Sequence, residues 1–209
     1  ADHPVRVFCC GRTDSGVHAI EQVIHFETET SRTNNAWLFG GNVNLPSDVN
    51  FTWAKEVEED FHARFNAYAR SYEYKIHNNP IRSSLKTNYY LWEPRKLNII
   101  EMKKAVSFLV GEHDFSCFRG RLCQAKTPIK TIEYIDIIES NDELILKIKA
   151  NAFLHHMVRN IVGTVLKIGR GEKDAEWILS VLDSKDRRKA GPTAEPQGLY
   201  FIKAFYENL

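Results

Sequence analysis

Long apolar runs are missing from this sequence of 209 residues. No stretch approaches the ~20 consecutive apolar residues that a helix needs to cross a bilayer, so we expect no membrane association. The opening Ala-Asp-His-Pro has neither the basic start nor the apolar core of a secretory signal. Cysteine is scarce, and the four that occur show neither zinc-ligand spacing nor disulfide density: Cys9, Cys10, Cys117 and Cys123. These absences predict a protein of the reducing cytoplasm without a metal site.

An excess of either charge is absent as well. The formal net charge is +1 and the isoelectric point is about 7.9, whereas dedicated nucleic-acid-binding domains often exceed ~9. Because the distribution of charge matters more than its sum, this balance neither favours nor excludes an RNA partner. Basic residues do gather in four short groups, each of which alone is typical of a solvated surface: Arg64 and Arg70; Arg119, Arg121, Lys126 and Lys130; Arg159, Lys167 and Arg170; and Lys185, Arg187, Arg188 and Lys189.

A polar loop between two strand-like runs is the most informative stretch that is present. Residues 11–19 read Gly-Arg-Thr-Asp-Ser-Gly-Val-His-Ala. The two glycines allow backbone angles that are closed to other residues, and loops held by rigid strands often carry chemistry. By itself the pattern leaves two interpretations open: a catalytic loop, or a structural ion pair between Arg12 and Asp14 in a tight turn.

This nine-residue loop resembles the catalytic loop of A-type tRNA pseudouridine synthases. Two further segments resemble motifs of the same family: Phe-His-Ala-Arg-Phe at 61–65 followed by Arg-Ser-Tyr-Glu-Tyr at 70–74, and Asn-Ala-Phe-Leu-His-His-Met-Val-Arg-Asn at 151–160. The resemblance covers nearly the whole chain, through the Gly-Leu-Tyr at 198–200. Family members begin with a strand bearing Tyr-Asp-Gly and a helix, which are not in this sequence, so we expect the first structural unit to lack them.

Hydrophobic periodicity predicts an α+β fold. Alternating patterns predict strands at 5–10, 22–28, 49–57, 68–77, 129–139, 143–151 and 199–205. Helical spacing predicts helices at 31–41, 97–110, 152–168 and 174–182, with a loop at 112–127. From residue 68 this is the order of a split β-α-β unit, and the earlier part repeats it without its opening strand and helix. We therefore predict two ferredoxin-like units with antiparallel sheets and an active-site cleft between them: 1–60 with the catalytic loop, a connector at 61–67, and 68–209.

The predicted helix at 152–168 has a polar face beside its apolar stripe. His155, Arg159 and Gly163 recur at four-residue spacing away from the apolar positions. Arg159 is therefore not on the core side, and the small Gly163 leaves room beside it. A solvated helix face is the alternative interpretation. Adjacent His155 and His156 cannot both aim at one ligand from a helix, which disfavours a metal site.

The resemblance implies roles for five residues. Asp14 is the catalytic carboxylate, and Arg159 pairs with it and keeps it ionised, because a nearby opposite charge favours the charged form. Tyr72 binds the substrate by stacking on an extruded base, although a tyrosine packed in the sheet is the alternative. Arg12 and Arg64 are the other substrate-binding residues, and Arg12 binds the RNA or helps to extrude the uridine.

The resemblance further implies that the protein isomerises uridine to pseudouridine in the anticodon stem-loop of tRNA, as a homodimer that binds tRNA across both subunits. The reaction breaks a C–N bond and forms a C–C bond, and nothing is oxidised. We therefore expect no nucleotide, metal or redox cofactor, and the sequence has no phosphate-cradling loop or zinc cluster. Three roles for Asp14 stay open: attack on the ribose, attack on the base, or proton abstraction.

Two other classes of protein are alternatives to a pseudouridine synthase. A non-catalytic RNA-binding module with a ferredoxin-like sheet has no need of an Arg-Thr-Asp loop. A base deaminase requires His-x-Glu and Pro-Cys-x-x-Cys, and neither motif is present. His18 and His62 are expected to hold loops in place and are left out of the catalytic set.

Overall fold

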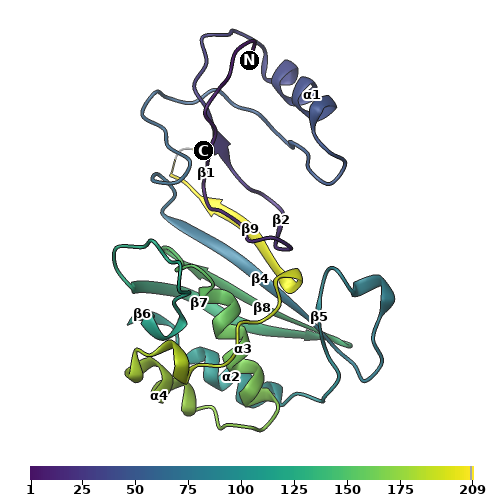
Figure 1. The fold of residues 1–209 in the computed structure, drawn as a ribbon, viewed down its shortest axis with the longest axis vertical. Coiled ribbons are helices and arrows are strands. Elements are labelled where there is room, and N and C mark those ends of the chain that lie inside the picture. Colours follow the sequence, from purple (N-terminus) through teal and green to yellow (C-terminus); the bar gives the residue numbers. More distant parts are fainter. Residues whose placement is uncertain (208) are drawn as a thin grey trace. The chain divides into compact units, whose positions relative to one another are not determined.

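The structure is a computed structural model that describes residues 1–207 and 209. Its contacts divide the chain into two compact units, each described separately below (Figure 1). The first comprises Ala1–Cys10 and Val23–Asn66, and the second comprises Gly11–Gln22 and Ala67–Leu209. The loop that carries Asp14 therefore makes its contacts within the second unit. Among the described residues, no helix has the length and apolar character needed to cross a membrane.

The first unit contains little regular structure. Strand β1 (Phe8–Cys9) pairs antiparallel with β3 (Ile24–His25), and the pairing continues through a hydrogen bond of 2.8 Å from Cys10 N to Val23 O. Helix α1 spans Asn34–Asn44. The hydroxyl of Thr33 caps its start by accepting from the backbone N of Ala36 at 3.2 Å.

The strand predicted at 49–57 is wrong, because that segment carries neither strand nor helix. The side chain of Asn42 instead accepts from Phe51 N at 2.6 Å and donates to Phe51 O at 2.9 Å. The Phe51 ring lies against α1, where a Cβ on Gly41 would come within 2.6 Å of it. A side-chain amide thus satisfies the backbone groups that a neighbouring strand would have paired. The apolar alternation at 49–57 lies in a largely exposed loop, in which Phe51 and Ala54 are partly buried.

The second unit is built on a mixed seven-stranded sheet, which confirms the predicted α+β class. The prediction of a purely antiparallel sheet is wrong here, because two of the strand pairs are parallel. The strand order is β2-β9-β4-β8-β7-β6, with β5 paired to β4. The pairs β2–β9 and β4–β5 are parallel, and the others are antiparallel. The strands are β2 (His18–Ala19), β4 (Ala69–Asn78), β5 (Leu91–Glu93), β6 (Gly111–Asp114), β7 (Ile129–Ser140), β8 (Glu143–Ala150) and β9 (Leu199–Phe205). The helices are α2 (Ile99–Ser107), α3 (Met157–Gly169) and α4 (Trp177–Ser184), with 3₁₀ turns at Ser84–Lys86, Ser116–Phe118, Arg187–Lys189 and Pro196–Gly198.

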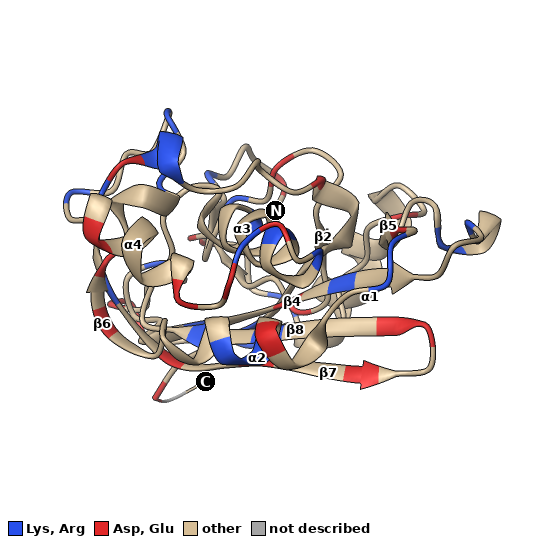
Figure 2. Cartoon of the chain, turned by 90° about the horizontal axis from the view of Figure 1, so that it is seen from below, with Lys and Arg blue, Asp and Glu red and all other residues tan. Residues whose placement is uncertain are grey.

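One face of this sheet is buried under the helices. Strand β8 shows the pattern directly, because its buried residues alternate with half-exposed ones: Leu144, Leu146, Ile148 and Ala150 are buried. Helices α2 and α3 join the same apolar core, and Asn98 N donates to Gly169 O across their ends at 2.7 Å. Acidic and basic residues are interspersed on α2 and along β7 and β8 (Figure 2).

Two predicted boundaries in this unit are wrong in ways that affect the site. The predicted loop at 112–127 contains most of strand β6 and a 3₁₀ turn at Ser116–Phe118. The helix predicted from residue 152 begins at Met157. The residue before it, His156, has a left-handed backbone with φ 63°, so the preceding residues cannot continue the helix.

A buried ion pair links strand β5 to the end of α3. The Glu93 side chain is 1% exposed and accepts from Arg170 Nε at 2.8 Å and from Arg95 Nε at 3.0 Å. Burial alone would raise the pKa of the Glu93 carboxyl, but the hydrogen bonds from Arg170 and Arg95 outweigh it and lower that pKa. Glu93 is therefore a charged group whose burial depends on its two partners.

We expect Arg170→Met to destabilise the protein by about 3 kcal/mol at pH 7, because it leaves the buried Glu93 carboxylate with only one of its two arginine partners. A lowered folded-state pKa contributes stability above the unfolded value of ~4.3, and this is lost as pH falls through the folded value. The difference in the free energy of unfolding between the variant and the unaltered chain should therefore become smaller in unfolding curves measured below about pH 4. Arg188→Met is the control, since Arg188 pairs with Asp186 on the surface, and an equal loss there would contradict the prediction.

Candidate active site

The loop that carries Asp14 is anchored at both ends. The Gln22 side chain donates to Gly11 O at 2.7 Å and accepts from Gly11 N at 3.4 Å, which ties the start of the loop to its end. Val17 N donates to Asp14 O at 3.0 Å. Gly16, which lies between these two residues, has φ +82°, a left-handed angle that favours glycine. Strand β2 then pairs with β9. Asp14 thus sits at a tight turn attached to the main sheet.

Arg159 reaches this turn from the first turns of α3. Its Nη1 lies 2.8 Å from Asp14 Oδ2, and its Nε donates to Ala194 O at 2.7 Å. Ala194 N in turn donates to Arg159 O at 3.1 Å. The Arg159 side chain is only 13% exposed. One guanidinium therefore joins the helix, the 194 segment and the Asp14 carboxylate in a fixed geometry.

Gly163 explains how the 194 segment comes so close to α3. A Cβ at this position would lie 1.7 Å from Pro192 O, so the two backbones are in direct contact. Gly191 meets the helix equally closely, since its Cβ would lie 2.4 Å from Gly163 O. The small residue predicted to leave room beside Arg159 makes room for this backbone, which supplies the carbonyl that holds Arg159.

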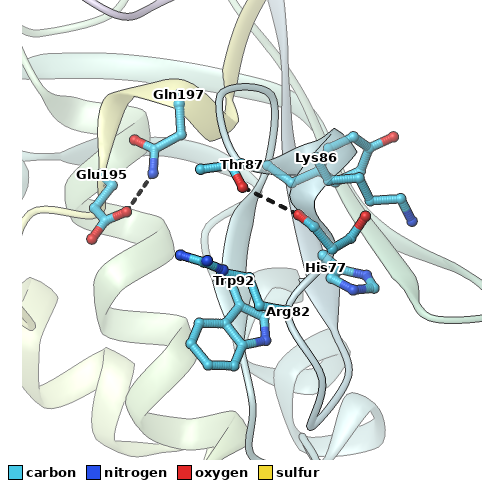
Figure 3. Close-up of a pocket in the computed structure, with 9 residues that line it drawn as sticks. His77, Arg82, Lys86, Thr87, Trp92, Glu195 and Gln197 are labelled. Atoms are coloured by element: carbon cyan, nitrogen blue, oxygen red, sulfur yellow. Dashed lines mark hydrogen bonds between the residues drawn. The ribbon is translucent and has the colours of Figure 1, made fainter.

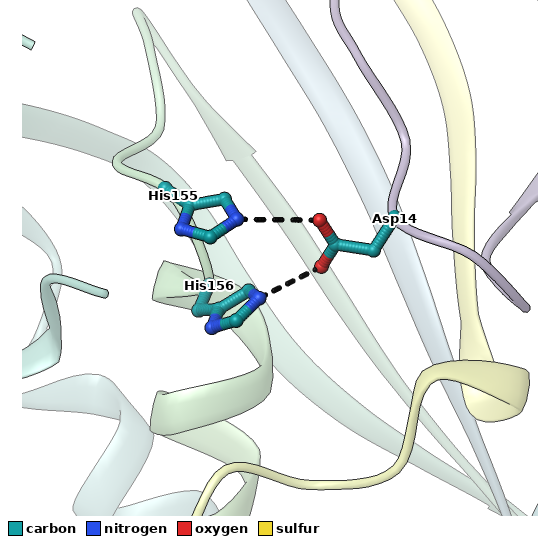
Figure 4. A group of neighbouring side chains, drawn as sticks. All are labelled: Asp14, His155 and His156. Atoms are coloured by element: carbon teal, nitrogen blue, oxygen red, sulfur yellow. Dashed lines mark ion pairs between the residues drawn. The ribbon is translucent and has the colours of Figure 1, made fainter. Parts of the chain in front are cut away.

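Both His155 and His156 contact the same carboxylate as Arg159 (Figure 4). His155 Nε2 lies 3.3 Å from Asp14 Oδ1, and His156 Nε2 lies 3.1 Å from Asp14 Oδ2. The two rings stack, with centroids 3.8 Å apart and planes at 27°. Burial lowers the pKa of His156, and His155 and Arg159 add to this effect against the opposing influence of Asp14.

The expectation that these adjacent histidines cannot aim at one ligand is wrong. It assumed a helix from residue 152, in which neighbouring side chains diverge by roughly 100°. Neither histidine lies in α3, and the left-handed backbone of His156 turns its side chain toward that of His155. A left-handed angle at a residue other than glycine costs about 1–2 kcal/mol, so the surrounding contacts must maintain it.

Tyr72 projects from β4 close to the start of the loop. A Cβ on Gly11 would lie 4.0 Å from its hydroxyl oxygen. Its ring packs edge-on against Phe153 and Phe201, with centroids 4.9 Å and 5.2 Å away. Tyr72 is therefore both a sheet-packing residue and a neighbour of the Asp14 loop, so the two interpretations of this residue are compatible.

The two remaining predicted residues are exposed. Arg12 precedes Asp14 on the same loop. Arg64 belongs to the first unit, where its guanidinium carbon lies 5.8 Å from the Phe65 ring centroid. Of the two loop histidines, His18 stacks on Tyr200 at 4.6 Å. His62 Nδ1 accepts from Arg64 N at 3.1 Å.

Comparison with known proteins decides the family. Residues 105–207 match the family described as tRNA pseudouridine synthase. The chain is 48% identical over 206 residues to tRNA pseudouridine synthase A of Hydrogenovibrio crunogenus, covering 99% of this chain and 79% of that protein. The same protein of Pseudomonas aeruginosa is 48% identical over 99% of this chain and 72% of its own length. This chain belongs to the tRNA pseudouridine synthase A family. The family predicted from the loop motif is thereby confirmed.

Within this pseudouridine synthase, sequence reasoning missed the histidine pair and Gly120. Gly120 N donates to His155 O at 2.8 Å, and a Cβ there would come within 2.8 Å of His155 Nδ1. The sequence signal for this pair was its position directly before the apolar residues of α3. The signal was misinterpreted because the predicted helix started too early and included both histidines.

The donor set around Asp14 has the composition of a metal site. Asp14, His155 and His156 each offer a ligand atom, and these atoms lie within 4.8 Å of one another. Two features fit a metal poorly. The Arg159 cation already contacts Oδ2, and the buried His155 Nδ1 has no hydrogen-bond partner, whereas the second ring nitrogen of a metal-bound histidine normally has one.

A separate cavity of about 210 Å³ lies in the second unit of the synthase. Glu195 and Gln197 line one side of it, and His77 and Lys86 line the opposite side (Figure 3). Lys86 is paired with Glu143 at 2.6 Å. The cavity therefore combines charges of both signs and is not a simple anion site.

Proposed function

We propose that this chain isomerises uridine to pseudouridine in the anticodon stem-loop of tRNA, with Asp14 as the catalytic carboxylate. The observation that carries the proposal is the ion pair between Arg159 of α3 and the carboxylate of Asp14, which lies on the predicted catalytic loop. The family membership supports the reaction, since the similar proteins are named tRNA pseudouridine synthase A.

The reaction balances within the substrate. The glycosidic bond between C1′ of the ribose and N1 of uracil breaks, and the freed base turns. A bond then forms between C1′ and C5, the proton leaves C5 for a base or water, and N1 takes up a proton, so the composition of the nucleotide is unchanged. This sequence requires a nucleophile or a base beside the sugar–base junction, a role that a carboxylate suits, but no external group. Asp14, half-buried on an anchored turn, can supply it as a nucleophile or as a base.

Tyr72, Arg12 and Arg64 are assigned to the substrate. The position of the Tyr72 hydroxyl next to Gly11 supports a role beside the extruded base. Exposed Arg12 on the same loop suits a contact with a phosphate or with the gap left in the stem. For Arg64 the support is its place in the family motif at 61–65 and its exposure.

We also propose that the chain follows a ferredoxin-like plan in two units, 1–60 and 68–209, joined at 61–67. The order β9-β4-β8-β7, together with α2 after β4 and α3 after β8, supports this for the second unit. The homodimer implied by the family and a cytoplasmic location belong to the same proposal. All four cysteines are free thiols, which suits a reducing compartment.

The test uses an unmodified tRNA transcript tritiated at uridine C5. Formation of the C1′–C5 bond displaces the C5 hydrogen, so the proposal expects tritium in water and pseudouridine in the digested RNA. Transcripts in which the anticodon-arm uridines are replaced by cytidine should release none. Bound tRNA without tritium release would instead indicate a non-catalytic RNA-binding module.

A further inference from the structure

Three side chains contact the Asp14 carboxylate, and they come from a segment of five residues, 155–159. Arg159 and His156 both contact Oδ2, at 2.8 Å and 3.1 Å, and His155 contacts Oδ1 at 3.3 Å. Contacts on both oxygens oppose rotation of the carboxylate about the Cβ–Cγ bond. Arg159 alone, bound to one oxygen, would leave that rotation less restricted.

The environment of His155 indicates which of its nitrogens carries the proton. Its Nδ1 is buried and has no hydrogen-bond partner. A neutral imidazole has one N–H, and leaving a buried lone pair unpaired costs less than leaving a buried N–H unpaired. An N–H is therefore placed on Nε2, which lies 3.3 Å from Asp14 Oδ1.

The neighbouring backbone holds this arrangement in place. Gly120 N donates to His155 O at 2.8 Å, and His155 N donates to Cys123 Sγ at 3.4 Å. A Cβ on Gly120 would also come within 3.3 Å of His156 Cβ. The loop at 119–123 thus packs against both histidines, at the point where His156 has its left-handed backbone.

From this geometry we propose that His155 and His156 are positioning residues that orient the Asp14 carboxylate through their contacts with its two different oxygens. The proposal rests on the proposed function, because the role of the carboxylate comes from it. The histidines contact Asp14 and not the reacting atoms. Their loss should therefore lower the rate of the chemical step and leave tRNA affinity unchanged.

The experiment compares leucine and glutamine replacements at each histidine. Glutamine restores an N–H donor at a reach similar to that of Nε2, whereas leucine does not. We expect His155→Leu and His156→Leu to lower kcat roughly 10- to 100-fold with little change in KM, as a misoriented catalytic group does. The corresponding glutamine variants should recover most of the loss. His113→Gln is the matched control, since His113 bonds Val110 O away from Asp14.

Several outcomes would overturn the proposal. Leucine variants with normal kcat would show that Asp14 needs no such orientation. Leucine and glutamine variants that lose kcat equally, while keeping the thermal midpoint of the unaltered chain, would show that a donor is not what matters. Loss of wild-type activity in EDTA, restored by Zn²⁺, would make the histidines metal ligands instead. Because the unaltered chain is assayed in parallel, absence of its own tritium release identifies failure of the proposed function.

Discussion

Replacing Asp14 with asparagine should abolish pseudouridine formation while tRNA binding stays close to that of the unaltered chain. Asparagine keeps the size of the side chain and one acceptor oxygen, so the contacts with Arg159 and His155 can persist in part. It can neither attack as an anion nor accept a proton. Loss of such a group typically lowers kcat by about 10⁴-fold or more.

The measurement is tritium release at saturating tRNA, with binding followed separately by filter retention. Asp183→Asn is a matched control, because Asp183 is an exposed carboxylate on α4 of the same unit. Turnover by Asp14→Asn within tenfold of the unaltered chain would remove Asp14 from the mechanism. Loss of binding together with turnover would instead point to a structural role for the carboxylate.

Replacing Arg159 with alanine should lower kcat by about 10²-fold or more. The substitution removes the 2.8 Å contact with Asp14 Oδ2 and the 2.7 Å contact with Ala194 O, so both the carboxylate and the 194 segment lose their common partner. Misplacement of a catalytic group by about 1 Å has an effect of this size. Because the side chain is largely buried, part of the loss will reflect local rearrangement.

Arg159→Lys separates charge from geometry. Lysine carries the same charge but has no planar fork, so it cannot reach Ala194 O and Asp14 at the same time. We expect it to recover less than a tenth of the unaltered kcat, measured in the same assay. Lys103→Ala, at an exposed position of α2, should leave kcat unchanged. Full recovery by lysine would show that positive charge near Asp14 is sufficient.

Patterns that are local in the chain predicted the second unit well. Strand β9 has the predicted bounds, and the hairpin of β7 and β8 lies within one residue of them. The strand and the hairpin were both predictable because side-chain alternation and turn residues are visible within one short segment of the sequence. The strand predicted at 49–57 is wrong because pairing needs a partner, and there the amide of Asn42 takes that place.

The site likewise divides into features that a local pattern predicts and features that depend on distant contacts. Its motif residues, among them Asp14 and Arg159, were identified from the sequence alone. Comparison with known proteins confirms the family. The contacts of His155 and His156 with Asp14 were missed. They depend on where α3 begins and on a left-handed angle at His156, and periodicity carries information on neither.

By itself, the sequence determined the family, the α+β class and the residues that bear chemical groups, because these follow from residue types and their spacing. Only the tertiary structure decided which groups meet. The close approach of residues 191–194 to α3 at Gly163 places the carbonyl that holds Arg159. The loop packed against Gly120 holds the histidine pair. Such contacts join segments more than 25 residues apart, and their geometry arises when backbones pack, which no local pattern encodes.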